Sequence, residues 1–237
     1  MVKKLSKKLT LLTCLMLLFS LISTSAFSSN IANASSVENI NLNSNEKYEV
    51  EYLENTDVYQ KIKFTNKETG EVEYLEADFT KENPEYHATY TDQQTKQQTE
   101  VLITTVEESM ITTNLTTNET KTEKIFNLED SIQPFGLPGG NGDYELRHTF
   151  HGSKQLSGNG TISLVAGILA SVYGGPVTGV IVSIATYLIS AGAPVFYYIH
   201  ELYFYKGVPN KPAAFVRYYE KSNYTGYLGA EYDNFIW

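Results

Sequence analysis

Alternating hydrophobic and polar positions dominate the chain between residues 48 and 127. In YQKIKF at 59–64 the apolar side chains fall on one face of a strand, and VEYLEA at 72–77 follows the same rule less regularly. This period of two predicts half-buried β-strands. Turn-like polar segments interrupt the pattern at 66–70, 92–96 and 117–121. A weak repeat of about 25 residues, made of strand, polar tip and strand, therefore predicts an antiparallel hairpin or meander domain of about five to seven strands.

A second pattern is a hydrophobic run without charge, because no Asp, Glu, Lys or Arg occurs from Gln155 to His200. The run is interrupted at Gly174-Gly175-Pro176, where two glycines stop one helix and the proline suits the first turn of the next. The pattern predicts a helical hairpin of 161–173 and 176–191. Residues 182–188, VSIATYL, are rich in β-branched side chains, so a strand remains an alternative for the second segment.

Length argues against a permanent membrane anchor, since a spanning helix needs about 20 apolar residues and the two segments have 13 and 16.

The aromatic run at 195–206 and the segment 214–220 are interpreted as strands. The predicted fold class is α+β, in which the N-terminal meander precedes a C-terminal domain. In that domain an apolar, Gly-rich helical hairpin packs with antiparallel strands.

Small residues recur along the hairpin at every fourth position, which aligns them where two helices approach closely in membranes. Tight packing inside a soluble domain explains the same spacing equally well. The candidates for membrane action or helix packing are Gly167, Ser171, Gly174, Gly175, Pro176, Gly179 and Ser183.

The first residues predict export. Four lysines precede the apolar run LLTCLMLLFSLI, and small residues follow it, which is the order of a secretory signal peptide. Cleavage after Ala26 is plausible and cleavage after Ala34 is preferred, so residues 1–34 are interpreted as the signal and the protein as secreted, in the manner of a Gram-positive bacterium. The single cysteine, Cys14, would leave with the signal, so the exported chain must fold without disulfides.

Charge divides the remaining chain. Residues 35–130 carry 21 acidic and 8 basic side chains, whereas residues 131–237 carry 6 of each. The acidic surplus argues against nucleic acid or anionic lipid as a partner of the front half. We therefore expect an acidic β-rich domain at 35–130 and an apolar, Tyr-rich α+β domain at 144–237.

A Pro- and Gly-rich linker at 131–143 joins the halves, and such exposed segments are preferred sites of proteolysis. Gly139 and Gly140 are candidate processing sites, so the acidic half is a candidate propeptide that associates with the C-terminal half. A plain interdomain linker explains the same composition.

Candidate catalytic chemistry is sparse. Glu107 and Glu108 are adjacent, and neighbouring residues of a strand point to opposite faces. His148 and His151 also face opposite sides of a strand, with His200 as a distant third histidine. The sequence contains no G-x-S-x-G motif, P-loop, Cys/His pair or glycosidase-like carboxylate pair. We expect no enzyme activity, no cofactor and no metal site.

Aromatic side chains are concentrated in the C-terminal half. Tyrosine and tryptophan combine an apolar body with a polar tip, so they suit bilayer interfaces as well as protein or sugar surfaces. Core packing on strands is the commoner role. The candidates for an aromatic interface are Tyr197, Tyr198, Tyr203, Tyr205 and Trp237.

The layout of signal, acidic strands, Pro/Gly join and apolar stretch resembles the large, unmodified secreted bacteriocins of Gram-positive bacteria, in particular the geobacillin type. The resemblance rests on this layout and on GILASVYGGPVTGVIVSIATYLISAG at 167–192. It implies an antibacterial protein that kills related cells at their membrane. The C-terminal half lacks the cationic surplus that attracts small bacteriocins to anionic lipid, which leaves room for a membrane receptor.

Three functions remain open at this point. The leading hypothesis is a secreted antibacterial protein whose hairpin acts on a target-cell membrane, with the membrane or a membrane receptor as partner. The second is a non-enzymatic extracellular or cell-surface binding protein, with the hairpin as core and the tyrosines as binding face. The third is a self-protection, immunity-type protein.

Overall fold

The computed structural model describes seven parts of the chain, all of which lie within Glu38–Trp237. These parts are residues 47–92, 95–106, 109–124, 127–129, 144–156, 160–206 and 208–234. The predicted signal peptide 1–34, the linker 131–143 and the residues Ala34, Glu107, Glu108, Gly139, Gly140 and Trp237 lie outside the described residues.

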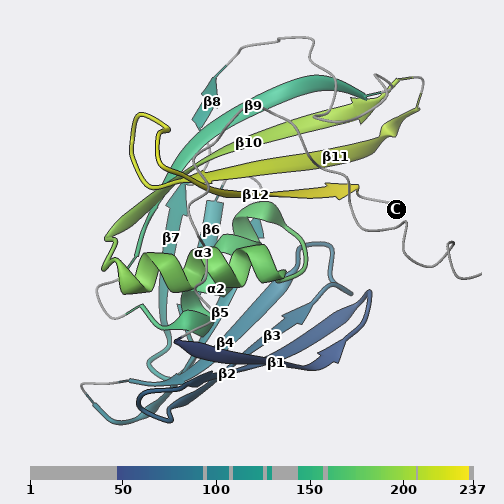
Figure 1. The fold of residues 1–237 in the computed structure, drawn as a ribbon. Coiled ribbons are helices and arrows are strands. Elements are labelled where there is room, and N and C mark those ends of the chain that lie inside the picture. The colour runs from purple at the N-terminus through teal and green to yellow at the C-terminus, as the bar shows by residue number, and fades with distance from the viewer. Residues whose placement is uncertain are drawn as a thin grey trace, which may run out of the picture. The chain divides into compact units, whose positions relative to one another are not determined.

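The first half of the described chain forms a seven-stranded antiparallel sheet, which we call the N-terminal sheet (Figure 1). Each strand pairs with the next in sequence order, as expected for a meander, so the predicted fold class is confirmed here. On β2 every second side chain, from Gln60 through Ile62 to Phe64, is buried. The strands are β1 (Tyr48–Asn55), β2 (Tyr59–Asn66), β3 (Val72–Asp78), β4 (Glu85–Thr91), β5 (Gln98–Val106), β6 (Ser109–Asn114) and β7 (Glu119–Lys124).

A second antiparallel sheet, called the C-terminal sheet, has the order β12-β11-β10-β9-β8. Its first strand in the sequence, β8, still belongs to the acidic segment, and Leu128 of β8 lies opposite Phe150 of β9. The chain therefore changes sheets between Lys124 and Asn127, before the predicted linker begins. The strands are β8 (Asn127–Glu129), β9 (Tyr144–Gln155), β10 (Val195–Tyr205), β11 (Val208–Tyr219) and β12 (Tyr227–Asn234).

Two helices separate β9 from β10: α2 (Ile162–Tyr173) and α3 (Gly179–Ser190). The predicted helical hairpin is confirmed, and the strand alternative for 182–188 is wrong. Those β-branched residues are helical because the side chains of α3 are buried along one face, and such tertiary packing overrides a weak helix propensity.

The ends of the helices have local causes. Gly174 ends α2 in the left-handed region, with φ of +81°, and its N–H bonds to Ala170 O. The Thr178 hydroxyl accepts a hydrogen bond from Ile181 N and begins α3. The predicted place of Pro176 in the first turn of the second helix is wrong, because Pro176 lies in the connecting turn and Thr178 supplies the cap.

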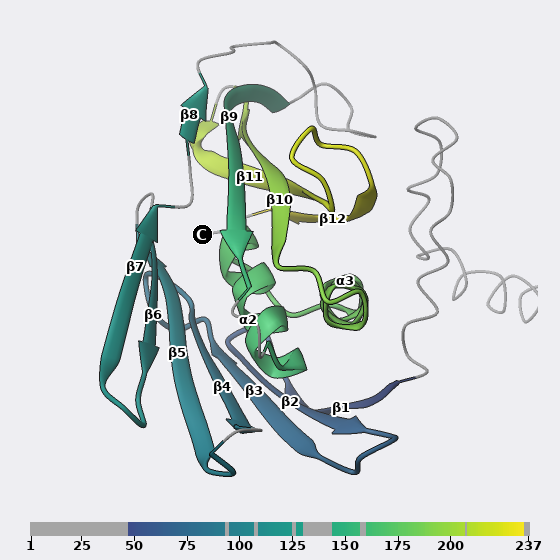
Figure 2. The same ribbon diagram turned by 90° about the vertical axis from the view of Figure 1, so that its left-hand side faces the viewer.

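Helix α2 is buried on nearly every side. Of its 12 residues, all except Leu164 are buried, and Figure 2 shows the helix between the two sheets. A single hydrophobic core joins side chains of both sheets and both helices, so the acidic and neutral segments of the chain share one interior. A helix that is apolar all round needs such an environment. Among the described residues, no helix combines the length and the hydropathy that crossing a membrane requires.

Candidate functional site

The candidate site is the hairpin formed by α2, α3 and the turn between them, together with the side chains that hold it. The first turn of α2 is held by Glu73 of β3. Glu73 Oε2 accepts hydrogen bonds from the backbone N–H of Ser163 at 2.9 Å and from its hydroxyl at 2.8 Å. The side chain of Thr161, the N-cap residue, makes no capping bond. A carboxylate from a distant strand therefore satisfies donors that the first turn of a helix leaves unpaired, at the positive end of the helix dipole.

Burial of Glu73 has an electrostatic consequence. Loss of water around the side chain raises the pKa of this carboxyl above its usual value, and the hydrogen bonds from Ser163 oppose that effect without cancelling it. The anchor at the start of α2 is thus a titratable group.

The end of α2 is held by Tyr86 of β4. Its hydroxyl donates to Gly175 O at 2.8 Å and lies 3.2 Å from Ala170 O, and the side chain is only 1% exposed. Thr105 of β5 donates to Ser171 O at 3.0 Å. Carbonyls in the last turn of a helix lack intrahelical partners, and the N-terminal sheet supplies these partners here.

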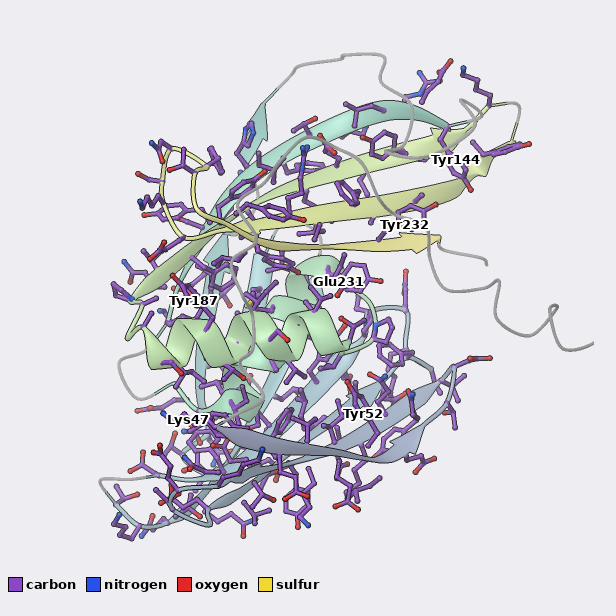
Figure 3. The ribbon with its side chains drawn as sticks, viewed as in Figure 1. Lys47, Tyr52, Tyr144, Tyr187, Glu231 and Tyr232 are labelled. Carbon is purple, nitrogen blue, oxygen red and sulfur yellow. The ribbon has the colours of Figure 1, made fainter. Side chains whose placement is uncertain are left out.

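The turn between the helices forms hydrogen bonds with side chains of both sheets. On the N-terminal side, Val177 N donates to Gln60 Oε1 at 2.8 Å, and the Tyr52 hydroxyl donates to Val177 O at 3.3 Å. On the C-terminal side, the Thr178 hydroxyl donates to Glu231 Oε1. Figure 3 shows Tyr52 on β1 and Glu231 on β12, on opposite sides of the hairpin. Both sheets therefore bind this turn, the N-terminal sheet at the backbone of Val177 and the C-terminal sheet at the side chain of Thr178.

The small residues that recur at every fourth position of the hairpin, which we call the small-residue stripe, do not form one helix-packing surface. Gly167 faces the N-terminal sheet, where an added Cβ would lie 2.9 Å from Ile103 Cδ1 and 3.2 Å from Leu75 Cδ1. A Cβ on Gly179 would meet nothing within 4 Å, and Ser183 is half-buried. The expected partner of the stripe was another helix, whereas Gly167 instead allows α2 to approach a sheet.

The other members of the stripe serve the turn. Ser171 donates to Ile168 O at 2.9 Å and lies 3.8 Å from Met110 Sδ. A Cβ on Gly175 would lie 2.4 Å from the ring of Tyr173, so only glycine fits beside that ring.

A glycine that the sequence analysis missed allows α3 to pack closely. At Gly229 of β12, an added Cβ would lie 2.9 Å from Ile184 Cδ1 and 3.0 Å from Val180 Cγ1. No pattern in the sequence links Gly229 to α3, since the two are brought together only by the C-terminal sheet.

The predicted aromatic interface residues are divided between the interior and the surface. Tyr198 is fully buried beside Phe196, with ring centroids 6.0 Å apart, and Tyr203 is buried with its hydroxyl donating to Glu201 at 3.1 Å. Tyr197 and Tyr205 are half-buried. Tyr198 and Tyr203 are therefore packing residues of this fold.

A different aromatic group lies on the face of the C-terminal sheet that points away from the helices. His151 and Tyr224 have ring centroids 4.8 Å apart, and Tyr219 lies 5.7 Å from Tyr224 and 5.9 Å from Tyr227. All four side chains are half-buried. Tyr224 has a φ of +56°, which is uncommon for a bulky residue. We call these four residues the aromatic cluster.

The histidines are dispersed. His148 and His151 lie on opposite faces of β9, and His200 of β10 is buried next to Phe150. Burial lowers the pKa of His200 from 6.5 to about 4, so the ring is neutral at pH 7. In the part of the chain that the structure describes, no three His, Cys, Asp or Glu side chains gather in a way that could hold a metal ion.

No protein-family model, curated protein or solved structure matches this chain.

Proposed function

We propose that this is a secreted antibacterial protein that acts at the membrane of a target cell through the hairpin Ile162–Ser190. The observation that carries the proposal is the nature of α2. It has no charge, it is apolar on all sides, and it is sheltered by a sheet from the acidic half of the chain. Such a helix is compatible with only two surroundings, a protein interior and the hydrocarbon of a bilayer.

The dimensions of the hairpin limit how it acts. Each helix has 12 residues and is therefore about 18 Å long, which is well short of the roughly 30 Å of a bilayer's hydrocarbon. The hairpin thus enters one leaflet or acts as an assembly of several copies.

Charge indicates how the protein reaches the membrane. The acidic half is repelled by anionic lipid and the other half is neutral, so a membrane receptor or the tyrosines of the C-terminal sheet provide the first contact. The resemblance of segment 167–192 to the geobacillin type supports the same function.

A reversible lock tests this proposal. A Cβ at Gly167 would lie 3.7 Å from Tyr86 Cβ, which matches the usual Cβ separation in a disulfide. In the secreted protein, which we expect to lack Cys14, the pair Gly167→Cys and Tyr86→Cys should tie α2 to the N-terminal sheet when oxidised. Near-UV circular dichroism verifies that both redox forms are folded.

Growth inhibition and membrane depolarisation are then measured on a panel of Gram-positive bacteria. We expect the wild-type protein to be active, the oxidised pair to be inactive, and the reduced, alkylated pair to recover activity. A wild-type protein that neither inhibits growth nor depolarises any strain would remove the proposal.

The aromatic cluster favours a second function, that of an extracellular binding protein. Three tyrosines and a histidine gather on one sheet face, and the backbone at Tyr224 is held in an uncommon conformation, as is frequent at binding sites. In this case the hairpin is a permanent core. Liposome partitioning separates the two functions, because a binder remains in the aqueous phase.

A further inference from the structure

We infer that the N-terminal sheet is an autoinhibitory cover. It holds α2 through polar anchors at both ends of the helix, and it opens while α3 stays packed on the C-terminal sheet. The inference rests on the proposed function and adds its regulation: the membrane-active surface is the face of α2 that this sheet conceals.

The anchors are side chains from neighbouring strands of the cover. Glu73 of β3 binds the first turn of α2, and Tyr86 of β4 binds the last turn and Gly175. Both contacts join residues 84 to 90 positions apart in the sequence. Between these two anchors the surface of the N-terminal sheet is apolar, and Ile103 and Leu75 lie against Gly167. Apolar contact is non-directional, so the polar bonds at the two ends fix where α2 lies on the sheet.

The opposite side of the hairpin is held independently of the cover. The Tyr218 hydroxyl of β11 donates to Leu169 O at 2.8 Å, and Thr178 bonds Glu231 of β12. Close packing of Ile184 on Gly229 secures α3 on the same sheet. The hairpin and the C-terminal sheet therefore remain together when the N-terminal sheet moves away, and the newly exposed surface is a charge-free face of α2.

Two buried positions distinguish movement of the N-terminal sheet away from α2 from unfolding of the whole protein. Ser171 is 2% exposed and lies beside Met110 of the N-terminal sheet, whereas Ile184 is fully buried against β12. Ser171→Cys and Ile184→Cys are each introduced into the protein together with Cys14→Ser, so that every sample has one thiol. The rate of thiol labelling under native conditions then measures how often each position opens.

Each probe is measured alone and together with Glu73→Ala or Tyr86→Phe. Tyr86→Phe removes one buried hydrogen bond and Glu73→Ala removes both bonds to Ser163, so either change should speed labelling at residue 171 by roughly tenfold or more. Because both changes also favour global unfolding, the cover is recognised from the absolute rates: residue 171 should label at least about tenfold faster than residue 184 in every background. Glu73→Gln is the matched control. It keeps an oxygen acceptor for Ser163, so labelling at residue 171 should remain near the wild-type rate.

Equal opening free energies at residues 171 and 184 would mean that α2 is exposed only by global unfolding, and this would overturn the inference. Unchanged labelling at residue 171 would overturn it as well.

Dye leakage from phosphatidylethanolamine and phosphatidylglycerol vesicles, measured on the same variants, separates this inference from the proposed function. Selective opening at residue 171 with leakage that rises in parallel supports both. Selective opening without leakage from vesicles or growth inhibition supports the cover and removes the membrane function. Leakage without selective opening supports the membrane function and removes the cover.

Discussion

The hydroxyl of Tyr86 donates to the backbone oxygen of Gly175 at 2.8 Å across 89 positions of sequence, and this bond joins the N-terminal sheet to the turn of the hairpin. The ring that carries the hydroxyl is itself among the most deeply buried side chains. A single residue therefore contributes both to the hydrophobic core and to the position of the hairpin.

Removing this hydroxyl should be costly. Tyr86→Phe keeps the ring but leaves the carbonyl of Gly175 without its donor, so we expect the free energy of unfolding to fall by about 1 to 2 kcal/mol. Urea denaturation followed by circular dichroism measures the change. Tyr59→Phe is the control, because the bond from Tyr59 to Glu76 is only partly buried and its loss should cost less than about 0.5 kcal/mol. Equal costs for the two variants would contradict this account.

Gly167 and Gly179 should respond in opposite ways to a larger side chain. Gly167→Val places atoms against Ile103 and Leu75, and overpacking of this kind should lower the free energy of unfolding by about 1 to 3 kcal/mol. Gly179→Ala meets open space and gains helix propensity, so it should raise the free energy of unfolding by up to about 1 kcal/mol. Thermal and urea unfolding of the two variants test the pair. A stabilising Gly167→Val would show that α2 does not approach the sheet this closely.

Acid should destabilise the fold through His200. The folded pKa is about 4 and the ordinary value is 6.5, so the unfolded chain binds the proton first as the pH falls. The contribution of His200 to stability is therefore complete above pH 6.5 and is lost between pH 6.5 and about 4, with a size of roughly 3 kcal/mol.

Urea denaturation at a series of pH values should show that His200→Phe removes much of this loss. If His200→Phe follows the wild-type profile, another group is responsible.

The pH dependence of stability that Glu73 causes should have the opposite sign to that of His200. Its pKa is raised in the folded protein, so its contribution to stability is complete below about pH 4.5 and is lost as the pH rises through the raised folded value. Glu73→Gln cannot ionise, and the difference in unfolding free energy between wild type and this variant should therefore shift in favour of the wild type as the pH falls. Chemical denaturation across pH 4 to 8 gives this difference directly. A difference that does not vary with pH would show that Glu73 is not desolvated in the folded state.

Removing Glu123 of β7 should lower the free energy of unfolding more than removing its ion-pair partner, Lys154 of β9. Lys154 is buried, whereas Glu123 is partly exposed and also pairs with Lys121. Glu123→Gln leaves a buried charge without a counterion and should lower the free energy of unfolding by about 3 kcal/mol, while Lys154→Met should change it by less than about 1 kcal/mol. Urea denaturation of both variants measures the two losses of stability. A larger loss for Lys154→Met than for Glu123→Gln would contradict this prediction.

Local patterns predicted the elements of this fold better than their contacts. Alternation in β2 and β3 predicted the meander, and Gly174-Gly175-Pro176 predicted the break between the helices, because both effects act on residues adjacent in the chain. The same reasoning placed Pro176 inside the second helix. Among the residues just after the break, only Thr178 has a side chain that can accept a hydrogen bond from the first turn, and its hydroxyl caps α3.

The candidate site was predicted only in part. The hairpin and its small residues were identified, yet the anchors Glu73 and Tyr86 were not, since nothing distinguishes them from other glutamates and tyrosines on alternating strands. Their role depends on the strand registers that bring β3 and β4 beneath the two ends of α2.

The sequence by itself determined the alternation of the N-terminal strands, the break between the two segments of the hairpin, the absence of charge in that hairpin, and the division of charge along the chain. These properties depend on residue type and on periodicity over a few positions. Only the tertiary structure decided that α2 is enclosed by two sheets, that Gly167 faces a sheet and not a helix, and that Gly229 receives α3. The physical reason is that close packing is set by which surfaces meet, and the surfaces in contact here come from segments many tens of residues apart.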